Sequence, residues 1–304
     1  MGLFGQHGSL VGLDIGSSAI KLVRLKQTSG SWALQAFSLG HLPPDAIVDG
    51  RIMNFSVVIE RLRELMREAG VKGGSCAIAV SGSSLIVKRL SLPEMTRQEL
   101  ADSIVWEAEQ YIPFDIKDVN VDAQIINSKA GQGQMDVMMV AAKKDVVNEY
   151  VSVAAEAGLT TEVVDVAIFA ALNMFEANYT IPADQTIALL NIGSNQINVG
   201  IMAGGAIAFT RDISTGGSRL TAEIQRQFNV SWEEAEAFKT GAESSLSSST
   251  IARDVNKLAE KVCDTIVGEI QRSLDFYVAT TVNANVNRLY LTGGSAQLPA
   301  LIRA

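Results

Sequence analysis

The sequence predicts an α/β protein of two similar domains. Two short stretches carry this prediction: VGLDIGSSAIKLVR at residues 11–24 and LLNIGSNQINVGIM at residues 189–202. Over the ten residues from Leu13 and from Leu190, the stretches share Leu, Ile, Gly, Ser and Ile at the same places. Each is typical of a strand, a Gly-Ser turn and a return strand. Among the positions that differ, Asp14 in the first copy corresponds to Asn191 in the second.

The composition is that of a globular protein long enough for two domains. Of the 304 residues, 47% are apolar and 19% are charged, an ordinary balance for a chain with a sizeable core. The formal net charge of −8 would repel phosphate backbones and anionic lipid head groups. Nucleic-acid binding and electrostatic membrane binding are therefore not expected.

The few cysteines and histidines indicate neither a disulfide scaffold nor a zinc site. Cys76 and Cys263 have no metal-type spacing, and His7 and His41 fall in segments that read as a tail and a loop. The N-terminus lacks the pattern of a signal peptide, and no run of about 18 apolar residues exists. The opening MGLFGQ departs from a myristoylation signal at Gln6, where Ser or Thr is required. The prediction is a reduced, cytoplasmic protein without membrane insertion.

The first part of the chain predicts a meander closed by a helix. Alternating apolar residues at 10–25 and 32–39 indicate antiparallel strands, and residues 56–69 place their apolar side chains on one helical face before Gly70. Strands are also expected at 76–80 and 84–92. Residues 1–92 plus 161–180 are expected to form the first domain.

Residues 93–160 have a different pattern and predict a small inserted subdomain. Thr96 and Glu99 form a capping-box pattern before a helix that runs to Tyr111. Residues 119–127 and 134–142 predict a hairpin around the turn SKAGQG. A helix over 145–157 and a strand over 161–166 are expected to complete the unit.

Residues 181–304 repeat the opening arrangement as a second domain. Strands are predicted at 187–192, 197–203 and 206–212, followed by helices over 218–228, 231–239 and 251–282. Residues 240–249 have the composition of a flexible loop. A strand that ends at Gly293 and Gly294 leads into a final helix.

The turn of the first copy has the residue types of a phosphate-binding nest, in which backbone N–H groups point into the bend. Gly16 permits close approach of a ligand, and Ser17 and Ser18 add hydroxyl donors. Lys21 supplies a positive charge, and Asp14 is placed to hold Mg²⁺ through water. For one copy alone an ordinary hairpin turn is the stronger interpretation. Two copies on facing domains favour a clamp around a triphosphate.

Five motifs together resemble the PilM family, the actin-like proteins of type IV pilus assembly, and the related cell-division protein FtsA. They belong to the superfamily of actin, sugar kinases and heat-shock chaperones. In chain order the motifs are MGLFG with VGLDIGSSAIKLV, EQYIPFDI at 109–116, TGGSRLT at 215–221, EEAEAFK at 233–239 and EIQRSLDFY at 269–277. The resemblance covers essentially the whole chain, and the order of the motifs is more specific than any one of them.

The resemblance implies an actin-like, ribonuclease H-like two-domain ATPase fold, with an FtsA-type subdomain at 93–160 and ATP or ADP with Mg²⁺ in the cleft. The implied nucleotide-binding residues are Asp14, Gly16, Ser17, Ser18 and Lys21 in the first phosphate loop, Asn191, Gly193, Ser194 and Asn195 in the second, Gly216 and Gly217 beside the nucleotide, Glu236 and Lys239 near ribose and adenine, and Gly293, Gly294 and Ser295 in the adenosine loop. Taken alone, Glu236 and Lys239 also fit an exposed i, i+3 pair.

Asn191 is the clearest departure from the superfamily, whose second loop carries an acid that orders the metal and the attacking water. A neutral Asn neither neutralises Mg²⁺ nor accepts a proton. The expectation is a protein that binds nucleotide and hydrolyses it slowly or not at all. The alternative is a strand-end Asn that only closes its turn.

An apolar cluster on the inserted subdomain is the candidate partner site. It comprises Trp106, Tyr111, Ile112, Pro113 and Phe114. Such clusters are most often local core. In PilM-like proteins the groove beside this subdomain takes a short cytoplasmic peptide of the membrane protein PilN, which would make part of the cluster an anchor pocket.

The implied function is a cytoplasmic nucleotide-binding scaffold at the inner membrane that binds the N-terminal peptide of PilN and contacts the pilus motor ATPases, with self-association left open. One alternative is an FtsA-like filament former, but the chain ends at Ala304 without the amphipathic helix of those proteins. A small-molecule kinase is less consistent, because no Asp is placed as a base for a substrate hydroxyl. PilM-like chains continue with a further strand and helix, so either the sequence is truncated or the second domain is incomplete.

Overall fold

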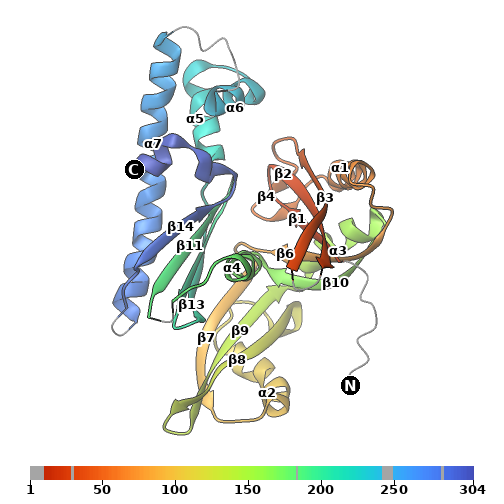
Figure 1. The fold of residues 1–304 in the computed structure, drawn as a ribbon, viewed down its shortest axis with the longest axis vertical. Helices are drawn as coiled ribbons and strands as arrows, with labels where there is room; N and C mark the ends of the chain where they lie inside the picture. Colours follow the sequence, from red (N-terminus) through yellow and green to blue (C-terminus); the bar gives the residue numbers. More distant parts are fainter. Residues whose placement is uncertain (1–9, 29–30, 183, 242–248, 282–283) are drawn as a thin grey trace. The chain divides into compact units, whose positions relative to one another are not determined.

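The chain forms two compact units, residues 1–170 and 171–304, each with its own strands and helices (Figure 1). The structure is a computed structural model, and it describes residues 10–28, 31–182, 184–241, 249–281 and 284–304. The expected loop at 240–249 lies mostly outside the described residues. Within the described part of the chain, no helix has the length and apolar character needed to cross a membrane.

The first unit contains a five-stranded sheet, and the predicted meander forms half of it. The strands lie in the order β10 (Leu159–Val166), β6 (Gly74–Val80), β1 (Val11–Ile15), β2 (Ala19–Thr28) and β3 (Ser31–His41). The strands β1, β2 and β3 pair antiparallel, as predicted, whereas β6 and β10 run parallel to β1. Side chains of β1 alternate between buried and exposed, which directs one face of the sheet to the core.

Two helices share a hydrophobic core with this sheet, α1 (Phe55–Glu68) and α3 (Lys144–Glu156). The side chain of Asn54 caps α1 by accepting a hydrogen bond from the N–H of Val57, and the helix ends before Gly70, which has φ of +66°. We expected α3 in the insertion, but its buried side chains join the core of the five-stranded sheet. A helical period shows which face of a helix is apolar and does not show which sheet that face meets.

Helix α3 also holds the small ribbon of β4 (Ile47–Val48) and β5 (Arg51–Ile52). Arg51 forms ion pairs with Asp145 and Glu149 of α3, and the Tyr150 hydroxyl donates a hydrogen bond to the carbonyl oxygen of Gly50. Burial raises the pKa of Tyr150 to about 12, so this hydroxyl remains a donor at neutral pH.

The inserted part is a three-stranded sheet in the order β7 (Leu85–Pro93), β9 (Gln134–Lys143) and β8 (Val119–Gly131). The hairpin of β8 and β9 and the helix α2 (Arg97–Glu109) are as predicted, and Thr96 and Glu99 form a complete capping box. A short 3₁₀ turn, η1 (Ile116–Asp118), precedes β8. Strand β7 was expected in the meander of the first domain but pairs with β9, so this sheet begins at Leu85.

The second unit has a four-stranded sheet with helices packed on its core. The strand order is β13 (Ala206–Ile213), β12 (Ile197–Ala203), β11 (Thr186–Ile192) and β14 (Arg288–Thr292). The helices are α5 (Ser218–Phe228), α6 (Trp232–Thr240), α7 (Ser249–Thr280) and α8 (Pro299–Arg303), with a 3₁₀ turn, η3 (Gly294–Gln297), before the last. One further helix, α4 (Ala167–Asn178), follows β10 and was not predicted.

Candidate functional site

The predicted second turn connects β11 to β12 and is the base of a compact polar cluster in the second unit. The N–H of Gly193 donates to the carbonyl oxygen of Gln196 at 2.8 Å, which closes the turn. A Cβ added to Gly193 would lie 2.9 Å from that oxygen, so the turn requires glycine here. The turn thus has the tight geometry that the sequence predicted.

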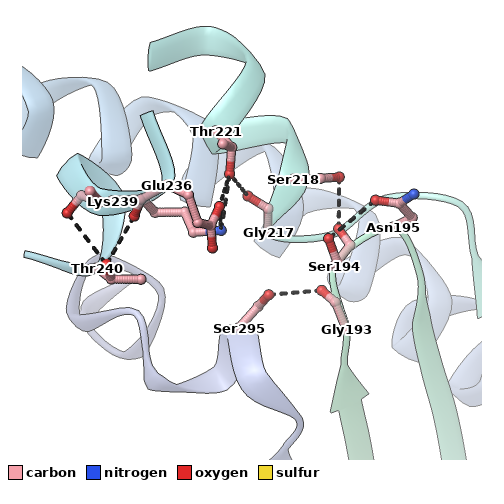
Figure 2. A network of polar contacts seen from close by, with 11 residues as sticks. Gly193, Ser194, Asn195, Gly217, Ser218, Thr221, Glu236, Lys239, Thr240 and Ser295 are labelled. Atoms are coloured by element: carbon pink, nitrogen blue, oxygen red, sulfur yellow. Dashed lines mark hydrogen bonds and ion pairs between the residues drawn. The ribbon is translucent and has the colours of Figure 1, made fainter. Parts of the chain in front are cut away.

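The loop before α5 docks on this turn through backbone hydrogen bonds (Figure 2). The N–H of Gly217 donates to the carbonyl oxygen of Gly193 at 3.1 Å. The N–H and the hydroxyl of Ser218 both donate to the carbonyl oxygen of Ser194, at 2.9 and 2.8 Å. A side chain at Gly216 would overlap the carbonyl oxygens of both turn residues. Close backbone contact therefore requires glycine at position 216.

A third segment, the loop after β14, reaches the same carbonyl oxygen. The hydroxyl of Ser295 donates to the carbonyl oxygen of Gly193 at 2.8 Å (Figure 2). Gly293 has φ of +92° and packs against Ile192, where a Cβ would overlap backbone atoms. The hydroxyl of Ser295 also occupies the position that a Cβ on Gly217 would take. Three of the predicted nucleotide loops thus meet at one point of the unit.

Glu236 and Lys239 adjoin the cluster from α6. The Lys239 ammonium lies 2.7 Å from the Glu236 carboxylate and donates to the hydroxyl of Thr221 at 3.0 Å. The same hydroxyl lies 2.7 Å from the Glu236 carboxylate. Only 9% of the Lys239 side chain is exposed, so the pair is not the solvated i, i+3 pair that was the alternative. Thr221, the buried centre of this network, was not among the predicted site residues.

Asn191 takes part in a polar chain across three strands. Its side-chain amide donates to the side-chain oxygen of Asn198 at 3.1 Å, and the amide of Asn198 donates to the Asp212 carboxylate at 2.8 Å. The three residues are directly opposite one another in the pairing of β11, β12 and β13. The side-chain amide of Asn191 therefore donates its hydrogen bond to a neighbouring strand of the same sheet. Sequence reasoning missed Asn198 and Asp212, although a buried Asn within the apolar strand β12 was a visible signal.

The first predicted phosphate loop lies in the first unit, between β1 and β2. The N–H of Gly16 donates to the carbonyl oxygen of Ala19 at 3.1 Å, which leaves Ser17 and Ser18 at the tip of the turn. Asp14 and Lys21 are opposite each other on the two strands, and their charged groups are 2.9 Å apart. Both side chains are substantially exposed, so the pair contributes little stability, about 0–1 kcal/mol. Lys21 can therefore exchange its carboxylate partner for a phosphate at low cost.

The surroundings of Asp14 suit Mg²⁺ only when phosphate is present. In the described part of the chain, no three acidic, histidine or cysteine side chains come together as a metal site. Mg²⁺ commonly binds one or two carboxylates and fills its other positions with water and substrate phosphates. The donor set thus fits a metal carried by a nucleotide.

The predicted partner cluster is divided by the fold. Ile112 is buried in the core of the three-stranded sheet, and Phe114 packs partly against that core. Trp106 is 74% exposed on α2. The Lys88 ammonium lies 4.3 Å from the Tyr111 ring centre, and Pro113 is exposed beside it.

A small hollow lies where the three-stranded sheet joins the five-stranded one. Its lining comes from the ends of β6 and β9 and the starts of β7 and α3: Val80, Ser81, Ser84, Leu85, Ala142, Lys143, Val146 and Val147. The lining is mainly apolar. The Lys143 ammonium lies 4.2 Å from the centre of the Phe114 ring, which connects one residue of the predicted cluster to the hollow.

Comparison with known proteins gives one family and several solved structures. The family model described as type IV pilus assembly protein PilM matches residues 12–304. The structure titled PilM-PilN type IV pilus biogenesis complex is similar, with a TM-score of 0.84, 28% identity, and coverage of 97% of this chain and 84% of that one. The ethanolamine utilization protein EutJ from Carboxydothermus hydrogenoformans shares the fold, with a TM-score of 0.55, 20% identity, and coverage of 97% and 79%.

A curated relative is the cell division protein FtsA of Bacillus subtilis (strain 168). It is 23% identical over 259 residues, which are 75% of this chain and 57% of FtsA. The chain therefore spans little more than half the length of that relative. The family match and the solved structures confirm the predicted family and the predicted actin-like α/β fold.

The glycine contacts around Gly193 make a first prediction. Gly216→Ala places a methyl group against two carbonyl oxygens and should lower the free energy of unfolding by about 1–3 kcal/mol, the usual cost of overpacking. Gly294→Ala is the matched control, because a Cβ there would meet no described atom within 4 Å. Hydrogen-exchange mass spectrometry should show faster exchange at the start of α5 in Gly216→Ala alone. Equal exchange in both variants would mean that the loop contact is not tight.

The polar chain makes a second prediction. Asn191→Asp removes the donor that faces the Asn198 side-chain oxygen and should lower the free energy of unfolding by about 1–3 kcal/mol, measured in urea. The double variant Asn191→Asp with Asp212→Asn allows Asn198 to turn over, so that its amide donates to position 191 and its oxygen accepts from position 212. Most of the lost stability should return. A single variant as stable as the parent would show that Asn191 only closes its turn.

Proposed function

Because the chain belongs to the family of type IV pilus assembly proteins PilM, we propose that it is a nucleotide-binding scaffold of the pilus assembly complex at the cytoplasmic face of the inner membrane. It binds a short N-terminal peptide of a PilN-like membrane protein and links that protein to the pilus motor ATPases. The observation that carries the nucleotide proposal is the convergence of two loops on the β11–β12 turn, with Lys239 of α6 bonded to Thr221 of α5 beside them.

The polar cluster of the second unit has the chemistry to hold a nucleoside phosphate. It contains close-packed glycines, the hydroxyls of Ser194, Ser218 and Ser295, which donate to Asn195, Ser194 and Gly193 within the cluster, and one nearly buried ammonium, that of Lys239. A Cβ at Gly217 would lie 3.7 Å from that ammonium, so the cation lies beside the glycine loop and the Ser295 hydroxyl. Hydroxyl groups and a lysine that is paired with one carboxylate suit ribose and phosphate oxygens better than they suit an apolar ligand.

The Gly16–Ser18 turn with Lys21 is the phosphate-binding element proposed for the first unit. A bound phosphate chain would bring its own Mg²⁺, and Asp14 is the carboxylate placed to hold that ion through water. When bound, the ion would supply charge neutralisation for the phosphates. The Asn191 amide, held by Asn198, offers no carboxylate at the second turn, so we propose a bound nucleotide with slow or no hydrolysis.

For the partner, the hollow beside β7 and α3 is the proposed seat of the peptide. The similarity to the PilM–PilN complex structure supports a PilN-like partner for this chain. The hollow is mainly apolar and too narrow to admit a water molecule, so an aliphatic side chain of an extended peptide would lie over its mouth. Lys143 and Phe114 form its border toward the three-stranded sheet.

Nucleotide binding is tested with a glycine pair on β1. Gly16→Val crowds the Ala19 carbonyl oxygen and the Lys21 ammonium, which already lie 3.2 and 3.4 Å from an added Cβ, and should abolish binding of ATP with Mg²⁺. Gly12→Val, where the nearest atom is 3.8 Å away, is the matched control and should bind like the parent. Isothermal titration calorimetry measures both. Equal affinity in Gly16→Val and the parent would remove the turn from the site.

Peptide binding is tested at the hollow. Val147→Glu puts a charge into the apolar lining and should weaken binding at least about tenfold, because a carboxylate loses hydration when an aliphatic side chain seals it. Asn148→Glu makes the same charge on the exposed neighbouring position of α3 and is the matched control. The probe is a fluorescently labelled peptide of the cytoplasmic N-terminus of a single-span pilus protein, followed by anisotropy. Equal weakening by both variants would point to a general charge effect outside the hollow.

A further inference from the structure

A short segment of the first unit joins the proposed phosphate turn to the proposed peptide hollow. Residues 42–54 connect β3 to α1 and include the ribbon of β4 and β5. At one end of this segment, the N–H of Leu42 donates to the carbonyl oxygen of Ser18 at 2.9 Å. Ser18 lies at the tip of the turn between β1 and β2, so the 42–54 segment begins on the backbone of the phosphate turn.

The other end of the 42–54 segment is bound to the beginning of α3. The Arg51 guanidinium lies 2.5 Å from the Asp145 carboxylate and 2.7 Å from the Glu149 carboxylate. The N–H of Ile52 also donates to the Glu149 carboxylate, at 3.3 Å. Only 17% of the Glu149 side chain is exposed, so this carboxylate is well shielded from water where the ribbon meets the helix. The ribbon and the first turns of α3 are therefore held together by charge as well as by backbone.

Both contact regions of the ribbon adjoin the hollow. Val146 and Val147, which follow Asp145 on α3, belong to the lining. Gly50 lies in the turn of the ribbon with φ of +78°, and a Cβ there would lie 3.4 Å from the carbonyl oxygen of Ser81, another lining residue. The position of the ribbon therefore affects two walls of the hollow, one on α3 and one at the end of β6.

Between its two ends, the 42–54 segment is part of the hydrophobic core of the first unit. The carbonyl oxygen of Ala46 accepts hydrogen bonds from the N–H groups of Met53 and Asn54, at 2.9 and 3.2 Å, which closes the segment on itself. Packed cores change between discrete arrangements and do not deform continuously, so we expect the segment to move as one body. Its buried side chains are those of Leu42, Ala46, Ile47 and Ile52.

We propose that the 42–54 segment couples the two ligand sites of the first unit, so that a nucleotide phosphate on the turn strengthens peptide binding at the hollow. The inference rests on the proposed function, since it needs both ligands. A phosphate held by the backbone of the turn fixes Ser18, and through Leu42 it fixes the segment whose far end positions α3 and Ser81. Arg51 is the positioning residue, because its guanidinium bridges the ribbon to two carboxylates of α3. By linkage, the peptide strengthens nucleotide binding by the same factor.

The test measures how ATP with Mg²⁺ changes the affinity of the full chain for the labelled pilus peptide, followed by anisotropy. In the parent, saturating ATP should lower the Kd for the peptide at least about fivefold, a usual size for coupling between two sites. Arg51→Met keeps an unbranched apolar stem and removes both ion pairs, so ATP should change the Kd by less than about twofold in this variant. Glu149→Gln weakens the same bridge from the α3 side and should reduce the coupling as well.

Arg89→Met is the matched control. Its guanidinium pairs with Asp136 on the three-stranded sheet, and the exposed fractions of that pair, 46% and 16%, are close to the 40% and 17% of Arg51 and Glu149. The control variant loses an ion pair of the same kind outside the 42–54 segment, so it should keep the coupling of the parent. Circular dichroism checks that all variants fold.

The ratio of the two Kd values separates positioning from a general loss of packing, which would weaken peptide binding equally with and without ATP. A parent that binds both ligands with no effect of one on the other overturns the coupling and leaves the proposed function standing. A parent that binds neither ligand overturns the proposed function and this inference with it. If Arg51→Met keeps the effect of ATP, or if Arg89→Met loses it equally, the 42–54 segment is not the connection between the sites.

Discussion

The carbonyl oxygen of Gly193 is the contact on which the candidate site of the second unit depends. It accepts a hydrogen bond from the Gly217 N–H of the loop before α5 and another from the Ser295 hydroxyl of the loop after β14. Its two lone pairs are thereby used by two segments about 20 and 100 residues away in the sequence. A side chain is excluded at Gly216 by the carbonyl oxygens of the turn and at Gly217 by the Ser295 side chain. The glycine pattern of the site is thus a packing requirement of this junction.

The two copies of the repeated turn have the same backbone and different electrostatics. In the first, Asp14 is matched by an exposed and weak ion pair with Lys21, which a phosphate can replace. In the second, the amide of Asn191 is directed by Asn198, which is itself fixed by the Asp212 carboxylate two strands away. An amide is needed at this point, because a carboxylate would face the side-chain oxygen of Asn198. The difference between Asp14 and Asn191 therefore reflects a different local network as well as a lost acid.

Much of the fold could be predicted from the sequence where the signal is local. The capping box at Thr96, the β8–β9 hairpin and the Gly-Ser turns depend on residues a few positions apart, and all form as predicted. The placement of β7 and α3 was missed, because an apolar stripe shows burial but not which of two sheets provides it. Helix α4 was missed although Ile168, Leu172 and Phe175 repeat at helical spacing, since its other positions are also largely apolar.

The candidate site could likewise be predicted only as far as local sequence signals reach. Motif spacing placed Glu236 and Lys239 near the glycine loops, but it could not show that a buried Thr221 would join them or that Lys239 would be almost fully covered. Because the Lys239 ammonium is buried, it lies in a region of low dielectric. Its attraction for an anion is stronger there, and the free-energy cost of leaving it without a partner is higher. The Glu236 carboxylate, 2.7 Å from the Lys239 ammonium, offsets that cost in the structure.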